Sequence, residues 1–389
     1  MNYFLTENQL MIRDLAREIT LEQVIPRAAE LDEKEEFPTA ILDILAKSGF
    51  MGLYIPEAYG GLAGSMGGGC LALCIATEEL SRGCGGTAVS YAANALGSFP
   101  ILLFGTEEQK KKYIPDIASG KHLAAFGLTE ANAGSDAQGI ETTARKDGDY
   151  YILNGTKQWI TNAGEADVYS VIAMTDKKKG GRGATAFIVE KGTPGFDFGK
   201  KEKKMGIRCS TTRGLIFEDV KVHKDQILGK EGLGFIVTMK TLDNARPGVA
   251  AQAVGMAQAA LDHAVKYSRE RRQFGQPICS FQAIQHMMAD MATQIEAARA
   301  IVYATARMID AGVKDFSRES AMCKLFATDA CMKVTTDALQ IFGGYGYMRE
   351  YPMEKLMRDA KITQIYEGTN QIQRNVIALD LIKEAAKRK

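Results

Sequence analysis

A single carboxylate stands in a short polar turn near the end of the chain, within the segment KITQIYEGTNQIQR at 361–374. Glu367 is followed by Gly368 and by hydroxyl and amide side chains such as Thr369 and Gln371, and the apolar run VIALDLI comes next. An enclosed carboxylate beside a glycine is suited to general-base chemistry, because burial raises its pKa toward neutrality. The alternative is a solvated loop residue, since short motifs often occur without function. The surrounding elements decide between these two interpretations.

Other residue types that carry chemistry form no recognisable site in the sequence. The seven cysteines are odd in number, lack CxxC spacing and have no clustered histidines, which indicates reduced and mostly buried thiols. Cys70 and Cys74 lie one helical turn apart, but without a histidine or a second pair nearby they do not predict a metal site. No GxGxxG follows a predicted strand, so a Rossmann dinucleotide site is not indicated.

Length and composition limit the class of protein. A chain of 389 residues is too long for one hydrophobic core, so two or three domains are expected. The charged fraction of 24% and the hydrophobic fraction of 46% argue against disorder. The net charge of +1 and the interrupted lysine runs argue against a nucleic-acid partner. Neither a targeting peptide nor a membrane span of about 18 apolar residues is predicted, and a cytoplasmic location is expected.

Hydrophobic periodicity predicts an α+β multidomain fold. Helical periodicity dominates the first third, where Thr6 with Gln9 predicts a capping box. Short β-branched or aromatic segments such as YYILNGTKQWI then alternate with turn residues, which is typical of an antiparallel β domain. Long Ala-rich runs follow and predict a four-helix bundle, with Pro247 at a first turn or at a kink. The predicted units are an N-terminal helical domain at 1–121, a middle antiparallel β domain at 122–230 and a C-terminal helical bundle at 231–389.

Four separated motifs resemble the acyl-CoA dehydrogenase family of flavoproteins, and the resemblance covers nearly the whole chain. They are FGLTEANAGSD at 126–136, KQWITNA at 157–163, RRQFG at 271–275 and IYEGTNQIQ at 365–373. Their joint order and spacing make a chance match negligible. The resemblance implies an FAD-dependent dehydrogenase that converts an acyl-CoA into a 2,3-enoyl-CoA and passes electrons to an electron-transfer flavoprotein.

By this resemblance Glu367 is the catalytic base that removes the α-proton of the thioester. No side chain accepts a hydride, so a cofactor must take it from the β-carbon. The backbone N–H of Glu367 is implied as a donor to the thioester carbonyl. Some family members place the base just before the arginine of a DxxR motif, where this chain has Ala245, and this strengthens the assignment to Glu367. The implied acyl-CoA contacts are Ser135, Asp243, Arg246, Tyr366 and Gly368.

The resemblance also implies where FAD binds. Leu128 and Thr129 would meet the pyrimidine edge of the flavin, and Trp159 would lie against its ring system. Without the family match, Trp159 is interpreted as a core aromatic residue. The implied contacts on the same subunit are Phe126, Leu128, Thr129, Trp159, Thr161, Thr369 and Gln371.

A second set of residues resembles those that reach the FAD of a neighbouring subunit. The planar guanidinium of Arg272 is suited to a pyrophosphate, although a solvated helix end is the alternative for this segment. The implied contacts across the interface are Arg272, Phe274, Gln282, Gln340, Gly343 and Gly344. A shared site predicts an oligomer, a homotetramer arranged as a dimer of dimers.

The sequence leaves the direction of the reaction and the acyl group open. A reductase that runs in reverse uses the same base and the same flavin, and a catalytically silent acyl-CoA-binding flavoprotein is a further alternative. An oxidase is not expected, because those chains usually carry a further C-terminal domain. The glycine-rich loop at 60–69 and the bulky Tyr91 could favour a short, branched or cyclic acyl group, although a plain core tyrosine is equally consistent.

Overall fold

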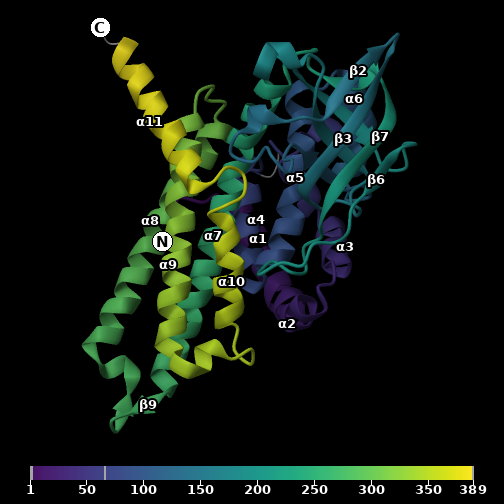
Figure 1. The fold of residues 1–389 in the computed structure, drawn as a ribbon. Helices are drawn as coiled ribbons and strands as arrows, with labels where there is room; N and C mark the ends of the chain where they lie inside the picture. Colours follow the sequence, from purple (N-terminus) through teal and green to yellow (C-terminus); the bar gives the residue numbers. More distant parts are fainter. Residues whose placement is uncertain (1–2, 65–66, 388–389) are drawn as a thin grey trace.

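The structure, a computed structural model that describes residues 3–64 and 67–387, runs from helices through a β-sheet and back to helices (Figure 1). The predicted α+β order is therefore confirmed. The N-terminal helices are α1 Glu7–Ile19, α2 Ile25–Lys34, α3 Thr39–Lys47, α4 Cys70–Gly83, α5 Gly85–Phe104 and α6 Glu107–Ala118.

Local sequence signals fix the start of two of these helices. Thr6 accepts a hydrogen bond from the Gln9 backbone N–H at 3.3 Å, and Gln9 Oε1 accepts from the Thr6 N–H at 3.0 Å. Thr106 and Gln109 repeat this reciprocal pair at the start of α6. The predicted capping box at Thr6 is confirmed, and each box satisfies two backbone donors that a helix start leaves unpaired.

The middle region forms an eight-stranded sheet in the order β6-β7-β3-β2-β4-β5-β8, with β1 paired to β4. Its strands are β1 Ala124–Gly127, β2 Thr143–Asp147, β3 Tyr150–Thr161, β4 Val168–Met174, β5 Ala184–Glu190, β6 Phe196–Phe198, β7 Thr212–His223 and β8 Ile227–Leu228. Most pairs are antiparallel as predicted, but β1 lies parallel to β4, and Thr143 of β2 makes one parallel pairing with Met174. The chain passes through the β2–β3 hairpin between β1 and β4, and a parallel pair requires such a long crossover.

The C-terminal bundle contains three long helices and a fourth position that is occupied by two shorter ones. They are α7 Gly234–Glu270, α8 Gln282–Asp310, α9 Ser317–Phe342, α10 Met353–Thr363 and α11 Asn370–Lys387. A small hairpin, β9 Arg272–Gln273 and β10 Gln276–Pro277, joins α7 to α8 at one tip of the bundle (Figure 1). The predicted turn around Glu367 is the break between α10 and α11.

Pro247 lies inside α7 and not at its first turn. A proline has no N–H, so it cannot donate to the carbonyl four residues earlier, which belongs to Asp243. Ser320 Oγ of α9 donates to that carbonyl at 2.6 Å instead. The interruption in α7 is thereby used to join α7 to α9 beside the residues predicted to bind substrate.

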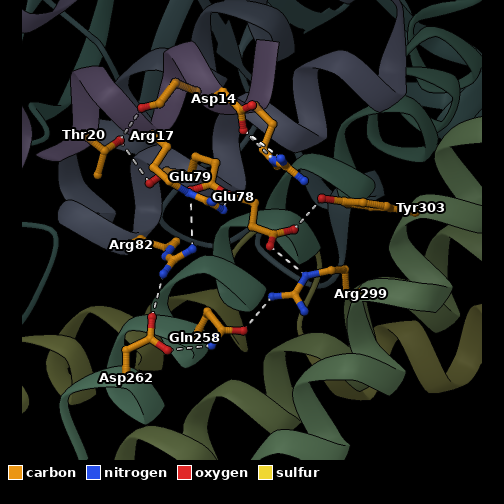
Figure 2. A network of polar contacts seen from close by, with 12 residues as sticks. Asp14, Arg17, Thr20, Glu78, Glu79, Arg82, Gln258, Asp262, Arg299 and Tyr303 are labelled. Atoms are coloured by element: carbon orange, nitrogen blue, oxygen red, sulfur yellow. Dashed lines mark hydrogen bonds and ion pairs between the residues drawn. The ribbon is translucent and has the colours of Figure 1, made fainter. Parts of the chain in front are cut away.

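The two helical regions share one apolar core, as predicted from the order of elements. Two buried carboxylates of α4 reinforce the junction (Figure 2). Glu78 accepts from Arg299 Nε of α8 at 2.8 Å and from the Tyr303 hydroxyl at 3.0 Å. Glu79 accepts from Arg17 of α1 at 2.7 Å. Buried carboxylates need such partners, so this network ties α1 and α4 to the bundle.

Within the described residues, the helix α5 is long enough and apolar enough to cross a membrane, judged by length and composition alone. The sequence analysis predicts no membrane span at this position. In the structure 72% of its most apolar window is buried, and the helix lies between β1 and α7. Its apolar composition is thus accounted for by packing on both sides.

Candidate active site

All three regions contribute walls to one cavity of about 330 Å³. The helices α4 and α5 supply only apolar side chains, among them Leu73, Val89, Leu96 and Phe99. The sheet region and the bundle supply the polar ones. A cavity with a hydrocarbon end and a small number of convergent polar groups is the usual form of a ligand site.

Glu367 lies in the turn between α10 and α11 and lines this cavity. Both Glu367 and Gly368 have left-handed backbone conformations, with φ of +53° and +88°. A side chain at position 368 would also place its Cβ 2.7 Å from Gln373 Nε2, which donates to the Gly368 carbonyl at 2.8 Å. The turn is therefore closed tightly around a glycine, and this closure directs the carboxylate of Glu367 inward.

The carboxylate of Glu367 has the electrostatic properties of a base that works near neutral pH. Burial raises its pKa to about 7, while the positive charges of Lys324 and Arg246 act in the opposite direction. Its Oε2 atom is buried and has no hydrogen-bond partner among the described residues. A buried oxygen left in this state is available to a group that enters the cavity.

Arg246 lies beside it on α7 and is almost fully buried. Its Nη1 donates to Asp243 Oδ1 at 3.0 Å, and Asp243 in turn accepts from the Ser317 hydroxyl. Burial lowers the pKa of Arg246, and the carboxylates of Asp243 and Glu367 oppose that effect. Arg246 Nε is buried without a partner in the described part of the chain. The predicted residues Asp243, Arg246 and Glu367 are thus assembled on one side of the site.

The sheet region forms the opposite wall with the predicted residues Phe126, Leu128, Thr129, Ser135, Trp159 and Thr161, all of which line the cavity. Trp159 has a φ of +58° at a bulge in β3, where the register with β7 shifts between Lys157 and Ile160. In this conformation Trp159 is 57% exposed. The core position that Trp159 alone would have suggested is therefore wrong.

Two charged residues that the sequence analysis did not select hold this wall in place. Lys157 Nζ donates to Glu130 Oε1 at 2.7 Å and to the Leu128 carbonyl at 3.1 Å. Glu130 also accepts from the backbone N–H groups of Glu141 and Thr142. Burial lowers the pKa of Lys157 to about 8. Both residues lie inside the motifs at 126–136 and 157–163. The sequence alone does not show that they form an ion pair with each other.

Tyr366 and Gly368 complete the set of predicted substrate contacts that line the cavity. The Tyr366 hydroxyl donates to Gln252 Oε1 of α7, a cavity residue that the sequence analysis also missed. Burial raises the pKa of Tyr366 well above its usual value, so this hydroxyl stays protonated and serves as a donor.

Other predicted cofactor residues lie away from this cavity. Arg272 and Phe274 occupy the exposed hairpin at the tip of the bundle, where Phe274 is 92% exposed, and Gln282 begins α8 nearby. Gly343 and Gly344 line a separate, open hollow of about 590 Å³ together with Gln273. Gln340 is an exposed residue at the end of α9. Thr369 directly precedes α11, Gln371 is the second residue of that helix, and neither lines the cavity.

The interpretation of Tyr91 as a pocket wall is wrong. Tyr91 is 1% exposed, and its hydroxyl donates to the Phe50 carbonyl at 3.0 Å, on the side of α5 that faces away from the cavity. The described residues of the 60–69 loop do not line the cavity either, and positions 65 and 66 lie outside the described residues. The neighbouring α5 residues Ala92 and Ala93 line the cavity instead, together with the α5 residues named above.

The wall around Trp159 fits a flat cofactor with a polar edge. The Trp159 side chain is exposed, and Thr129, Ser135 and Thr161 contribute hydroxyl-bearing side chains to the lining of the same cavity. The Thr129 carbonyl is already used by the Gln158 N–H at 2.8 Å, so the loop is fixed before any ligand arrives. Stacking against an aromatic ring and hydrogen bonds at its margin are what an isoalloxazine requires.

Comparison with known proteins gives a consistent result over the whole length. Three family models match, for the N-terminal, middle and C-terminal domains of acyl-CoA dehydrogenase, at residues 6–121, 125–220 and 232–382. A short-chain specific acyl-CoA dehydrogenase of Megasphaera elsdenii is 51% identical over 96% of this chain and 97% of its own. An acryloyl-CoA reductase (NADH) of Anaerotignum propionicum is 48% identical over 98% and 96%.

Solved structures agree with these sequence relatives. The butyryl-CoA dehydrogenase of Megasphaera elsdenii has a TM-score of 0.96 at 50% identity and covers 98% of this chain and 100% of its own. A chain described under the electron transferring flavoprotein of Acidaminococcus fermentans has a TM-score of 0.94 at 54% identity, with 98% and 99% covered. An acyl-CoA dehydrogenase of Bacillus anthracis complexed with FAD has a TM-score of 0.92 at 36% identity, covering 100% of this chain and 69% of its own.

Proposed function

The chain belongs to the acyl-CoA dehydrogenase family, and from this premise we propose that it oxidises short acyl-CoA thioesters to 2,3-enoyl-CoA products with Glu367 as the base. Membership makes it an oxidoreductase that acts on CH–CH bonds, and FAD is its cofactor. One observation carries the proposal for the base. A cavity-lining carboxylate has a pKa of about 7 and a buried oxygen without a hydrogen-bond partner among the described residues.

The residues of the chain divide the remaining work between them. Glu367 takes the α-proton on its carboxylate, which is ionised above a pH of about 7. Its backbone N–H is proposed to donate to the thioester carbonyl and so to stabilise negative charge on that oxygen. The wall formed by Leu128, Thr129, Trp159 and Thr161 would hold the flavin, which when bound accepts the hydride from the β-carbon.

The proposed contacts to the acyl-CoA come from both faces of the cavity. Ser135 lies on the sheet side, and Arg246, held by Asp243, lies on the bundle side. Tyr366 and Gly368 flank the base. These side chains would orient the thioester so that its α-carbon meets Glu367, which is the positioning on which proton transfer depends.

The shape of the apolar end supports a short acyl group. A cavity of about 330 Å³ is at the small end of the range for ligand sites. In this proposal it must receive both the flavin ring and the acyl thioester. Leu96 and Phe99 are bulky apolar side chains in the part of the lining that α5 supplies. The short-chain specific acyl-CoA dehydrogenase and the butyryl-CoA dehydrogenase of Megasphaera elsdenii, to which this chain is similar, support the same size class.

The exposed hairpin at the tip of the bundle is proposed to complete the FAD site of a neighbouring subunit. Arg272 and Phe274 are exposed and remote from the cavity of their own chain, so a role in cofactor binding requires a second copy. Gly343, Gly344 and Gln340 would form the adenine side of that shared site. This arrangement supports a homotetramer, with an electron-transfer flavoprotein as the electron acceptor, as the relationship to the Acidaminococcus chain suggests.

A reductase that converts a short 2,3-enoyl-CoA into the saturated thioester is the second candidate. The 48% identity to an acryloyl-CoA reductase over nearly the full length favours it. The same Glu367 would then deliver a proton to the α-carbon, so the geometry serves both directions.

An anaerobic titration of the yellow holoenzyme tests these proposals. Butyryl-CoA should bleach the flavin absorbance, whereas octanoyl-CoA should bleach it poorly. Reoxidation of the reduced enzyme by crotonyl-CoA or acryloyl-CoA, without bleaching by any saturated thioester, would support the reductase instead. No spectral response to either class of thioester would contradict both.

A further inference from the structure

A lysine of α9 has its amine buried directly behind the catalytic turn. Lys324 is 0% exposed and shares its helix face with Ser320, Ala327, Thr328 and Cys331, which are also buried. Lysine is rarely buried completely, because its charge loses hydration there. A lysine in such a position needs specific partners, and those partners indicate what it does.

The partners of Lys324 are the residues that immediately follow the base. Its Nζ donates to the Gly368 carbonyl at 2.9 Å and to Asn370 Oδ1 at 2.8 Å. Asn370 Nδ2 in turn donates to Thr328 Oγ1 at 2.9 Å and to Asp329 Oδ1 at 2.7 Å, both on α9. The amine therefore fixes the strained turn and the first residue of α11 to one rigid helix.

The same amine is a source of positive charge for the base. Burial lowers the pKa of Lys324 to about 7, while the charge of Glu367 opposes that effect and the charge of Arg246 adds to it. The charge of Asp329 also raises the pKa of Lys324. The other titratable groups around the turn are Tyr366, which precedes the base, and Asp243 on α7. Lys324 and Glu367 each favour the charged form of the other, so their titrations are linked.

We propose that Lys324 is a positioning residue for the base: its amine clamps the turn that carries Glu367 through the Gly368 carbonyl and Asn370, and it places a cation next to the carboxylate. This inference rests on the proposed role of Glu367. It assigns to α9 a part in proton transfer, although Lys324 does not line the cavity.

Two neutral variants separate the clamp from the charge. Lys324→Gln keeps amide N–H donors for the Gly368 carbonyl but removes the charge, and Lys324→Met removes both. Loss of a nearby opposite charge should raise the pKa of Glu367 by about one unit, so the acid limb of kcat/KM should move to higher pH by the same amount. In Lys324→Met the limiting kcat should fall as well, because the turn is no longer held. Lys324→Arg should restore the position of the acid limb.

The readout that does not depend on turnover is the infrared carboxyl band of Glu367, followed against pH in the holoenzyme with Glu367→Gln as the baseline. Lys333→Met is the matched control, since Lys333 lies on the same helix and pairs at the surface with Asp337. An unchanged carboxyl titration in folded Lys324→Gln would overturn the inference. If that variant does not fold, Lys324→Met takes its place, and an unchanged titration in it would overturn the inference as well. Full turnover by Glu367→Gln would instead overturn the proposed base itself.

Discussion

Glu367 Oε2 and Arg246 Nε belong to two residues that line one cavity, and within residues 3–64 and 67–387 neither atom has a hydrogen-bond partner. Glu367 Oε2 can accept a hydrogen bond or a proton, and Arg246 Nε can donate a hydrogen bond. Buried polar atoms are rarely left in this state without a reason. Their joint presence in the lining of one cavity marks the place where the thioester is proposed to bind.

Glu367→Gln should retain FAD and acyl-CoA binding and lose turnover by several orders of magnitude. The amide is nearly the same size but cannot take a proton, and a general base contributes about 10²–10⁴-fold to a rate. Flavin bleaching by a saturated thioester in a stopped-flow experiment measures the change. Glu18→Gln, at an exposed position of α1, is the control and should be indistinguishable from wild type. Wild-type turnover by Glu367→Gln would remove the assignment.

The pH dependence of kcat/KM in the dehydrogenase direction should show an acid limb near pH 7. Burial raises the pKa of Glu367 to about 7, and only the ionised carboxylate can accept the α-proton, so activity rises as the pH passes upward through that value. The raised pKa also means that the folded state binds more protons than the unfolded state between about pH 4.5 and 7, so this group lowers the stability as the pH rises through that window. An acid limb near pH 4.5 would show that the carboxylate is not desolvated.

Gly368→Ala should lower both stability and turnover. A left-handed backbone costs a residue with a Cβ about 1–2 kcal/mol, and here the new methyl group would also meet Gln373 Nε2. Gly312→Ala is the matched control, because Gly312 has a φ of +74° with open space around it. Both variants should lose a similar amount of unfolding free energy from the backbone, but only Gly368→Ala should lose turnover. Equal turnover in the two variants would contradict the tight closure of the turn.

Arg272→Ala should weaken the retention of FAD while leaving the cavity of its own chain intact. The FAD content after gel filtration measures the effect, and Arg269→Ala, an exposed neighbour on the last turn of α7, is the control. Unchanged FAD content would show that the hairpin does not reach a cofactor in a neighbouring subunit.

Arg299→Ala should destabilise the fold by about 3–5 kcal/mol, because it leaves the buried carboxylate of Glu78 without a cation. Burial already raises the pKa of Glu78, and removing Arg299 should raise it further. Arg349→Ala breaks an exposed ion pair with Glu33 and should change the stability by less than about 1 kcal/mol. Chemical denaturation measures the free energy of unfolding of both variants. A similar loss in the two would show that the buried ion pairs of α4 do not stabilise the junction between α4 and the bundle.

The sequence predicted those features that depend on local or motif signals. The capping box at Thr6 needs only residues three positions apart, and the turn at Glu367 was located from its own motif. The orientation of Tyr91 could not be read, because a helix that is apolar on all sides does not reveal which face meets a cavity. The exposure of Trp159 depends on a β-bulge, which is set by pairing with a distant strand.

Lys324 shows the same limit most clearly. In the sequence it is one lysine in an ordinary helix, and a surface role is the usual interpretation. Its spacing of four residues from both Ser320 and Thr328 places it on the buried stripe of α9, and this pattern is the signal that could have identified it. Its partners Gly368 and Asn370 are more than forty positions away, so only the fold brings the amine to the turn.

The cavity has walls from the N-terminal helices, the sheet and the bundle, and this shared construction makes ligand occupancy visible in the melting temperature of the entire chain. A ligand that binds only the folded state adds its binding free energy to the free energy of unfolding, about 2.7 kcal/mol at a hundredfold excess over Kd. Thermal shifts can therefore rank acyl-CoA thioesters by chain length without turnover or an electron acceptor. The preferred acyl group is the one whose thioester raises the melting temperature most at a given concentration.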